Sequence, residues 1–140
     1  MDRLWSDKVG FMTELTGRLG AMAEQCATDY LTTKGYRIIT RNYRKPWGEI
    51  DIVAEKEEVV VFVEVKANRK EIAGFEPELR VNPHKHHKMA RIARTFLSDF
   101  RFSAEQPWQL DILAVTFVKE KGSLFAKCSM YNKIIVNKSF

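Results

Sequence analysis

Three ionisable residues lie within two short apolar runs of this 140-residue sequence, where charged side chains need compensation. Asp51 lies inside the run 49–55, and Glu64 and Lys66 end the run 59–66. Side chains alternate along a strand, so Glu64 and Lys66 project from one face. A hairpin that pairs the two runs brings Asp51 beside Glu64. Two carboxylates this close are favourable only if a cation lies between them or if one is protonated.

A hard divalent ion is the simplest way to satisfy this pair of carboxylates. Mg²⁺ or Mn²⁺ takes oxygen ligands and keeps several waters, so we predict Asp51, Glu64 and the backbone carbonyl of Val65 as ligands. Lys66 is placed to stabilise or deprotonate an attacking water. The alternative is an ordinary Glu64–Lys66 ion pair at a strand end, with Asp51 paired to a nearby arginine, because the spacing alone carries little information.

A helix precedes these runs and supplies a third carboxylate. Apolar residues recur at helical spacing from Leu19 to Leu31 and predict a helix over roughly 17–34, with Thr16 as its cap. Glu24 flanks the apolar stripe, so it either borders a groove beside the core or is a solvated helix residue. Residues 1–16 are too apolar for a simple tag, and we predict an N-terminal arm or short helix there.

Strand-forming runs follow the helix. The runs 36–43, 49–55 and 59–66 are joined by short links, which predicts an antiparallel meander. The third run begins with five consecutive apolar residues, as expected of a central strand covered on both faces. Two later runs, 109–117 and 124–131, predict further strands. Trp47, in the link before the second run, is interpreted as cover for the sheet edge, with stacking on an unpaired base as the alternative.

A second amphipathic helix precedes the last two strands, and its exposed side is basic. Four cations recur there at every third residue or close to it, namely Lys85, Lys88, Arg91 and Arg94. Such a row is either a solvated face or a contact for nucleic-acid phosphates. His84, His86 and His87 lack the separated ligand pairs of a structural zinc site, so we interpret them as part of the same cationic cluster.

Composition restricts the class of protein. Hydrophobic residues make up 45% of the sequence, which is enough for one domain with one core, and we place that domain at 17–140. The formal net charge of +5 favours polyanionic partners. No apolar run approaches a membrane span and no secretory signal begins the chain, so we expect a cytoplasmic protein with no membrane partner. Cys26 and Cys128 have no metal or redox spacing and are predicted to be buried hydrophobes.

Several motifs together resemble a known family. They are the segment Gly20-Ala-Met-Ala-Glu24, the run Gly35-Tyr36 to Arg44, Gly48-Glu49-Ile50-Asp51, and Val61-Phe62-Val63-Glu64-Val65-Lys66. This combination closely resembles the bacterial YraN family of uncharacterised proteins over roughly 17–117. The resemblance implies a restriction-endonuclease-like PD-(D/E)xK fold similar to archaeal Holliday junction resolvases. It also implies a nuclease site made of Glu24, Asp51, Glu64 and Lys66.

Two positions depart from the pattern of that family. Ala23 replaces the usual glycine before the helix glutamate, a change that a helix accommodates easily. Gln109-Leu110-Asp111 replaces Arg-Phe-Asp, so any role of that arginine is missing. We predict that Asp111 pairs within the fold and does not bind metal.

The sequence therefore predicts an α/β domain with a central mixed sheet of about five strands flanked by helices, in the order αβββαββ. The predicted function is Mg²⁺- or Mn²⁺-dependent hydrolysis of DNA phosphodiester bonds, including those of branched or structured DNA. Glu49 shares a strand face with Asp51 and is either a supporting carboxylate or a solvated edge residue. RNA is an alternative substrate, and the likeness to resolvases favours a homodimer. The alternative function is a non-catalytic nucleic-acid-binding or protein-assembly module on the same fold.

Overall fold

The computed structural model describes the backbone of residues 5–69 and 83–136, and the side chains of residues 17–67 and 87–131. The elements in chain order are helix α1 (Trp5–Thr33), strands β1 (Arg37–Lys45), β2 (Gly48–Lys56) and β3 (Val59–Arg69), helix α2 (Pro83–Asp99), and strands β4 (Trp108–Glu120) and β5 (Ser123–Val136). The predicted α/β class, the order of elements and the mixed five-stranded sheet are confirmed.

The sheet has the strand order β1-β2-β3-β4-β5. Its first three strands form the predicted antiparallel meander, and β5 returns antiparallel to β4. Only β3 and β4 run parallel among these strands, because the segment between them, which includes α2, crosses over to the other end of the sheet. The central strand β3 is therefore paired on both sides over its apolar half, as its sequence predicts.

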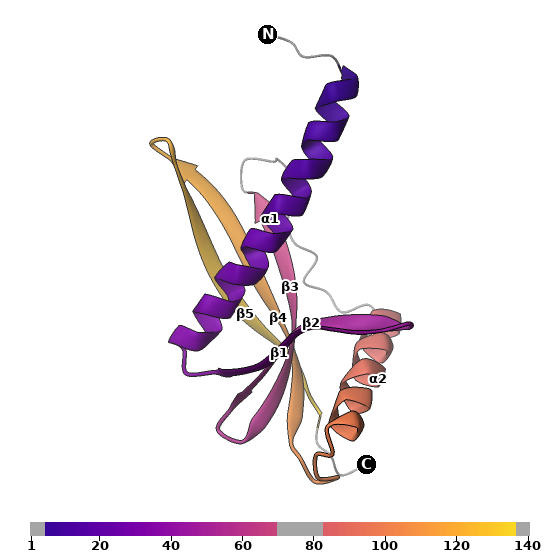
Figure 1. Ribbon diagram of the computed structural model, residues 1–140. Coiled ribbons are helices and arrows are strands. Elements are labelled where there is room, and N and C mark those ends of the chain that lie inside the picture. Colours follow the sequence, from indigo (N-terminus) through magenta and orange to yellow (C-terminus); the bar gives the residue numbers. More distant parts are fainter. Residues whose placement is uncertain (1–4, 70–82, 137–140) are drawn as a thin grey trace.

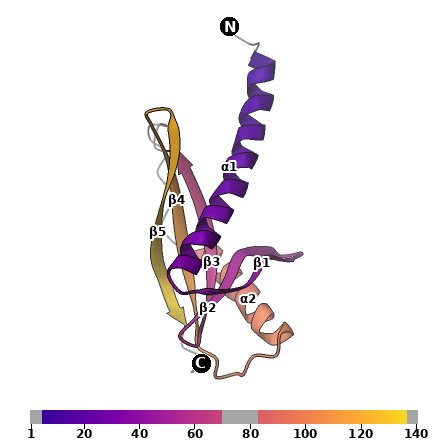
Figure 2. The same cartoon turned by 60° about the vertical axis from the view of Figure 1, so that its left-hand side comes forward.

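The two helices cover opposite faces of the sheet (Figures 1 and 2). The α1 face is packed with small and branched side chains, including Ala23, Ala27, Ile52 and Val63. The α2 face is built around Phe62 and other aromatic rings. These two apolar layers pack against both faces of β3. Apolar packing alone therefore fixes the position of this strand, without a contribution from its charged residues.

Helix α1 begins earlier than the sequence predicted. It starts at Trp5 and not near residue 17, so Thr16 is an interior residue of the helix and not its cap. A threonine caps a helix only where the preceding chain leaves helical geometry, and residues 5–15 hold no proline to force that exit. The C-terminal end follows the prediction: Gly35 has a φ of 93°, and the amide of Tyr36 donates to the carbonyl of Leu31 at 2.9 Å.

The two cysteines meet where α1 crosses β5. They were predicted to be buried, but both are half-buried free thiols, and Cys128 Sγ lies 3.9 Å from the carbonyl oxygen of Cys26. Burial raises the pKa of each thiol above its ordinary value. Within the residues that the structure describes, no helix has the length and apolar character that a membrane crossing requires.

Candidate functional site

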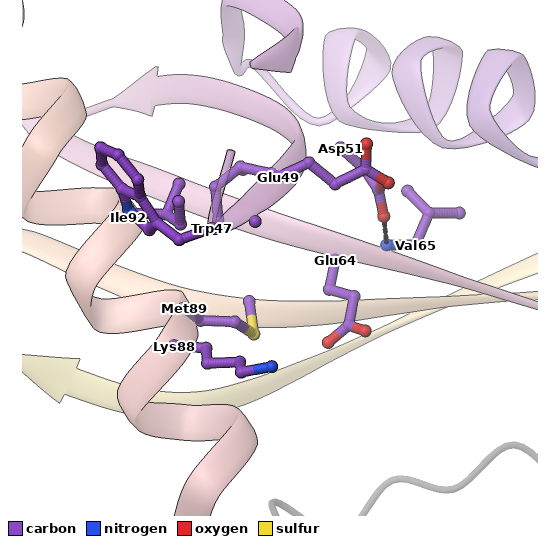
Figure 3. A pocket seen from close by; sticks show the side chains of 10 residues that line it. Trp47, Glu49, Asp51, Glu64, Val65, Lys88, Met89 and Ile92 are labelled. Carbon is purple, nitrogen blue, oxygen red and sulfur yellow. Dashed lines mark hydrogen bonds between the residues drawn. The ribbon is translucent and has the colours of Figure 1, made fainter. Parts of the chain in front are cut away.

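The site lies where strand β2 separates from β3. The ladder between these strands runs from Lys56 opposite Val59 as far as Ile52 opposite Val63. One residue further on, the Asp51 carboxylate replaces the backbone partner and accepts a hydrogen bond from the amide of Val65 at 2.7 Å (Figure 3). The buried amide is thus satisfied by a side chain, and β2 is free to turn away.

The predicted approach of Asp51 and Glu64 follows from this register. Both side chains line one cavity of about 410 Å³, together with residues of the β1–β2 turn and of α2. Figure 3 shows the Glu64 carboxylate projecting into the space that Lys88 also enters. Lys66 is on the same face of β3, and its Nζ lies 3.4 Å from Glu64 Oε1. The structure therefore brings Asp51, Glu64 and Lys66 together.

The electrostatics of Asp51 differ from those of a surface aspartate. Burial raises the pKa of its carboxyl to about 6, and the hydrogen bond from Val65 opposes that shift. Repulsion from the nearby carboxylates of Glu49, Glu64 and Glu24 raises the pKa further. Asp51 therefore sits at the centre of a concentration of negative charge, where the binding of a cation would favour its ionised form.

The simpler interpretation of these residues as ordinary ion pairs holds for one pair only. Glu64 and Lys66 do form an ion pair, with both side chains mostly buried. The hydrogen bond to Asp51 comes from the Val65 amide and not from an arginine. The N–H and C=O of one strand residue point to the same edge, so the Val65 carbonyl also faces the edge from which β2 has turned away.

Glu24 is held at the border of the site by strand β1. Its Oε1 accepts hydrogen bonds from Arg41 Nε at 3.0 Å and from Asn42 Nδ2 at 2.8 Å. The β1–β2 register places Asn42 opposite Asp51, between the pairs Arg41–Ile52 and Tyr43–Ile50. Glu24 is near enough to contribute to the raised pKa of Asp51, but it is not among the residues that line the cavity, and two hydrogen-bond donors already bind its carboxylate.

Glu49 has features of both of its interpretations, as a cavity residue and as an exposed edge carboxylate. It lines the same cavity, and its Oε2 accepts a hydrogen bond from Arg44 Nε at 2.9 Å on the exposed edge of the hairpin. Within the residues whose side chains are described, no three histidine, cysteine, aspartate or glutamate side chains converge closely enough to form a metal cage by themselves. The candidate oxygen donors are therefore two carboxylates and a backbone carbonyl, those of Asp51, Glu64 and Val65.

The described cations of the basic row of α2 have two kinds of surroundings. Lys88 lines the cavity. The Arg91 guanidinium lies 4.7 Å from the centre of the Trp47 ring, and that of Arg94 lies 5.8 Å from the centre of the Trp108 ring. The side chain of Lys85 lies outside the described residues, as do those of His84 and His86. Among the described members of the row, only Lys88 reaches the cavity wall.

Asp111 pairs within the fold, as predicted. It is completely buried, and both of its carboxylate oxygens accept hydrogen bonds from Gln109 Nε2, at 3.1 and 2.9 Å. Gln109, one of the residues that depart from the family pattern, is thus its partner. Asp111 does not line the cavity that holds Asp51.

Sequence reasoning missed two features of the site. Trp47 was interpreted as cover for the sheet edge, yet it lines the cavity and remains 37% exposed. Asn42 was quoted only as part of a motif, yet it holds Glu24 from a left-handed backbone conformation with a φ of 53°. An asparagine in the middle of a β-rich run could have indicated such a backbone irregularity, because asparagine tolerates positive φ better than most residues.

The fold and the site together define a class of protein: a small α/β protein in which acidic and basic side chains meet beside a split in a mixed sheet. The chain belongs to the uncharacterised protein family UPF0102, whose model matches residues 23–115. This confirms the resemblance to YraN-type proteins. The matched segment contains Glu24, Asp51, Glu64 and Lys66.

Several curated members of that family are similar over most of their length. The chain is 40% identical to the UPF0102 protein of Thermodesulfovibrio yellowstonii over 97 residues, which cover 69% of this chain and 84% of the relative. It is 39% identical to a UPF0102 protein of Syntrophus aciditrophicus, over 74% of this chain and 80% of the relative. A UPF0102 protein of Alkaliphilus oremlandii is also 39% identical, over 74% of this chain and 89% of the relative.

Proposed function

We propose that this protein is a metal-dependent nuclease that hydrolyses DNA phosphodiester bonds. The observation that supports the proposal is the cluster of Asp51, Glu64 and Lys66 at the edge of a cavity that Lys88 also lines. Carboxylates that face a divalent ion, with a lysine beside them, are suited to charge that develops on a phosphoryl group and on an attacking water.

The residues present fit a hard divalent ion such as Mg²⁺ or Mn²⁺. The donor set is all oxygen, and burial together with three neighbouring carboxylates raises the pKa of Asp51, an environment in which a bound cation would favour its ionised form. Asp51, Glu64 and the carbonyl of Val65 would hold the ion. When bound, such an ion polarises a phosphoryl oxygen and lowers the pKa of a coordinated water.

The protein's own residues position the reactants. In hydrolysis, a water oxygen forms a bond to phosphorus, the bond to the leaving oxygen breaks, and that oxygen takes up a proton. Lys66 orients the attacking water from its place beside Glu64, and Lys88 contacts a phosphate of the bound strand. Glu24 positions the site through Asn42, which lies opposite Asp51.

The test is cleavage of a panel of labelled DNAs with Mg²⁺ or Mn²⁺: supercoiled plasmid, a flap, a four-way junction and a single strand. We expect scission by the wild type, and a loss of roughly 10²- to 10⁴-fold in rate for Lys66→Ala. Lys127→Ala, on an exposed part of β5, is the matched control and should keep wild-type activity. Binding of the panel without scission would instead support a non-catalytic module, and equal scission by both variants would place the chemistry elsewhere.

A further inference from the structure

The tip of the β1–β2 hairpin is fixed against helix α2. A Cβ on Gly48, which has a φ of 154°, would lie 3.3 Å from the Ile92 side chain, so any other residue here would adopt a strained backbone and would push the Ile92 side chain aside. Lys45 Nζ lies 2.9 Å from Asp99 Oδ2, and the Tyr43 hydroxyl donates to the same oxygen at 2.8 Å. These contacts therefore fix the position of the residues at the hairpin tip, beside the site.

Packing of aromatic rings strengthens this attachment. Tyr43 packs edge-on against Phe96 of α2, with ring centres 5.1 Å apart, and Phe96 stacks on Phe100 with centres 4.5 Å apart. Phe96 also packs edge-on against Phe62 of β3. Phe62 and Phe96 are completely buried, so this part of the hairpin is anchored in the core.

Trp47 lies at the end of this anchored hairpin but does not share its burial. Its side chain is 37% exposed, whereas Trp108, which also lies beside an arginine of α2, is 5% exposed. The Trp47 ring is a wall of the cavity that contains Asp51 and Glu64. Figure 3 shows it beside Ile92 at one end of the cavity, with the Asp51–Val65 hydrogen bond at the other. A residue that only covered the sheet edge would not need to face this space.

Arg91 gives the exposed ring a defined environment. Its guanidinium lies 4.7 Å from the ring centre, close enough for a cation–π interaction that restricts the orientation of the indole. Arg91 is itself exposed, so its charge remains available to a phosphate. An aromatic wall with a cation beside it, next to a proposed phosphate site, matches the chemistry of an unpaired nucleotide.

We propose that Trp47 is a stacking platform for an unpaired base beside the phosphate held at the site, so that the substrate is DNA with single-stranded character. This inference rests on the proposed function and specifies its substrate class. Bases inside a duplex already stack on both faces, so they offer no free face to an indole unless they are unpaired or flipped out. A single-stranded segment, a flap or a branch point provides such a base without the cost of unstacking.

The first experiment measures binding, so that it does not depend on catalysis. Fluorescence anisotropy of a labelled single strand and of the same sequence as duplex is recorded in EDTA, for the wild type, Trp47→Ala, Trp47→Phe and Phe125→Ala. We expect Trp47→Ala to weaken binding of the single strand roughly 5- to 100-fold and to change binding of the duplex less than about twofold. Trp47→Phe should restore most of the affinity. Phe125→Ala, a matched exposed aromatic on β5, should change neither.

A second readout separates stacking from a structural role of Trp47. In a single strand that contains 2-aminopurine, stacking on the indole should quench the base fluorescence on binding to the wild type and to Trp47→Phe, but not to Trp47→Ala. Thermal unfolding of each variant shows whether the fold is retained. The inference is overturned if single strands fail to bind, or if Trp47→Ala changes binding of single strand and duplex equally.

The two proposals can fail separately. Scission that depends on Lys66 but is confined to perfect duplex would keep the nuclease and overturn the stacking platform. Quenching that depends on Trp47, without scission of any DNA in the panel, would keep the platform and overturn the nuclease.

Discussion

Two aspartates in this protein, Asp51 on β2 and Asp111 on β4, have carboxyl pKa values raised to about 6, and burial is the main cause in both cases. Their surroundings nevertheless differ. Gln109 donates to both oxygens of Asp111, and this side chain has no exposed surface. Asp51 lines a cavity, and Glu64 and two further carboxylates lie near enough to raise its pKa.

The comparison shows that a perturbed pKa does not by itself distinguish a site from a core polar residue. Desolvation acts on any buried carboxyl, whatever the residue does. Asp51 differs from Asp111 because it lines a cavity and because neighbouring carboxylates, which also carry negative charge, raise its pKa. Those are the features that a cation, and through it an anionic substrate, can use.

The most direct test of this difference is to neutralise each aspartate in turn. Asp51→Asn should lower the rate of DNA cleavage by at least about 100-fold, because it removes a charged ligand while keeping the shape of the side chain. Asp111→Asn should keep the rate within about threefold of wild type. Rates under single-turnover conditions, with circular dichroism as the control for folding, decide the matter. Full activity of Asp51→Asn would refute the proposed mechanism.

The pH dependence of stability tests Asp111 by itself. Its pKa is raised on folding, from an ordinary 3.8 to about 6, so the folded state binds the proton more tightly than the unfolded state. This contribution to stability is fully present below pH 3.8 and is lost as the pH rises through about 6. We expect the loss to amount to roughly 1–3 kcal/mol.

The Asp111→Asn variant provides the control for that measurement. Its free energy of unfolding, from urea titrations without divalent ions, should fall less between pH 4 and pH 6.5 than that of the wild type. Identical pH profiles for the two proteins would show that Asp111 does not titrate differently in the folded state.

Metal binding should also distinguish the two aspartates, with a smaller effect than that expected on the cleavage rate. A saturating concentration of Mg²⁺ should raise the melting temperature of the wild type and of Asp111→Asn by a few degrees, because a ligand that binds only the folded state stabilises it. The shift should be absent from Asp51→Asn. Differential scanning fluorimetry with Mg²⁺ and, as the ionic-strength control, NaCl provides the measurement. An equal shift in all three proteins would exclude Asp51 as a ligand.

The smallest expected effect concerns the basic wall of the cavity near Asp51. Lys88→Gln should weaken DNA binding a few-fold and reduce the slope of log K against log salt by about 0.7–0.9, the value for one phosphate contact. Lys121→Gln, in the exposed turn between β4 and β5, removes the same charge far along the sheet and should leave the slope unchanged. A slope that is the same for both variants would remove Lys88 from the DNA contact.

Much of this arrangement could be predicted from local sequence patterns. The short links between three strand-forming runs predicted the meander, and the two-residue period of a strand then placed Glu64 and Lys66 on one face of β3. The convergence of Asp51 with them required only that the hairpin pair in register. Helical geometry placed Glu24 at the flank of the apolar stripe of α1, but it did not indicate the hydrogen bonds from Arg41 and Asn42.

Other features depend on tertiary contacts that no local pattern encodes. The start of α1 was placed too late, because the sequence does not distinguish a threonine that caps a helix from one, such as Thr16, that lies inside it. The position of Trp47 in the cavity wall could not be predicted, because it depends on how far the hairpin bends toward α2. The separation of β2 from β3 depends on a side chain that takes over a backbone hydrogen bond, and neither strand's own sequence indicates that exchange.

Because a side chain replaces a backbone partner here, the Val65 amide can report on the state of the site. The Val65 N–H is protected by the carboxylate of Asp51, whereas every second amide from Val63 toward Val59, on the same edge of β3, lies within the ladder to β2. Its rate of exchange with deuterated solvent therefore depends on whether that carboxylate keeps its hydrogen bond, and not only on opening of the sheet. The NMR resonance of this one amide would thus record changes at the site without an attached probe and without turnover of a substrate.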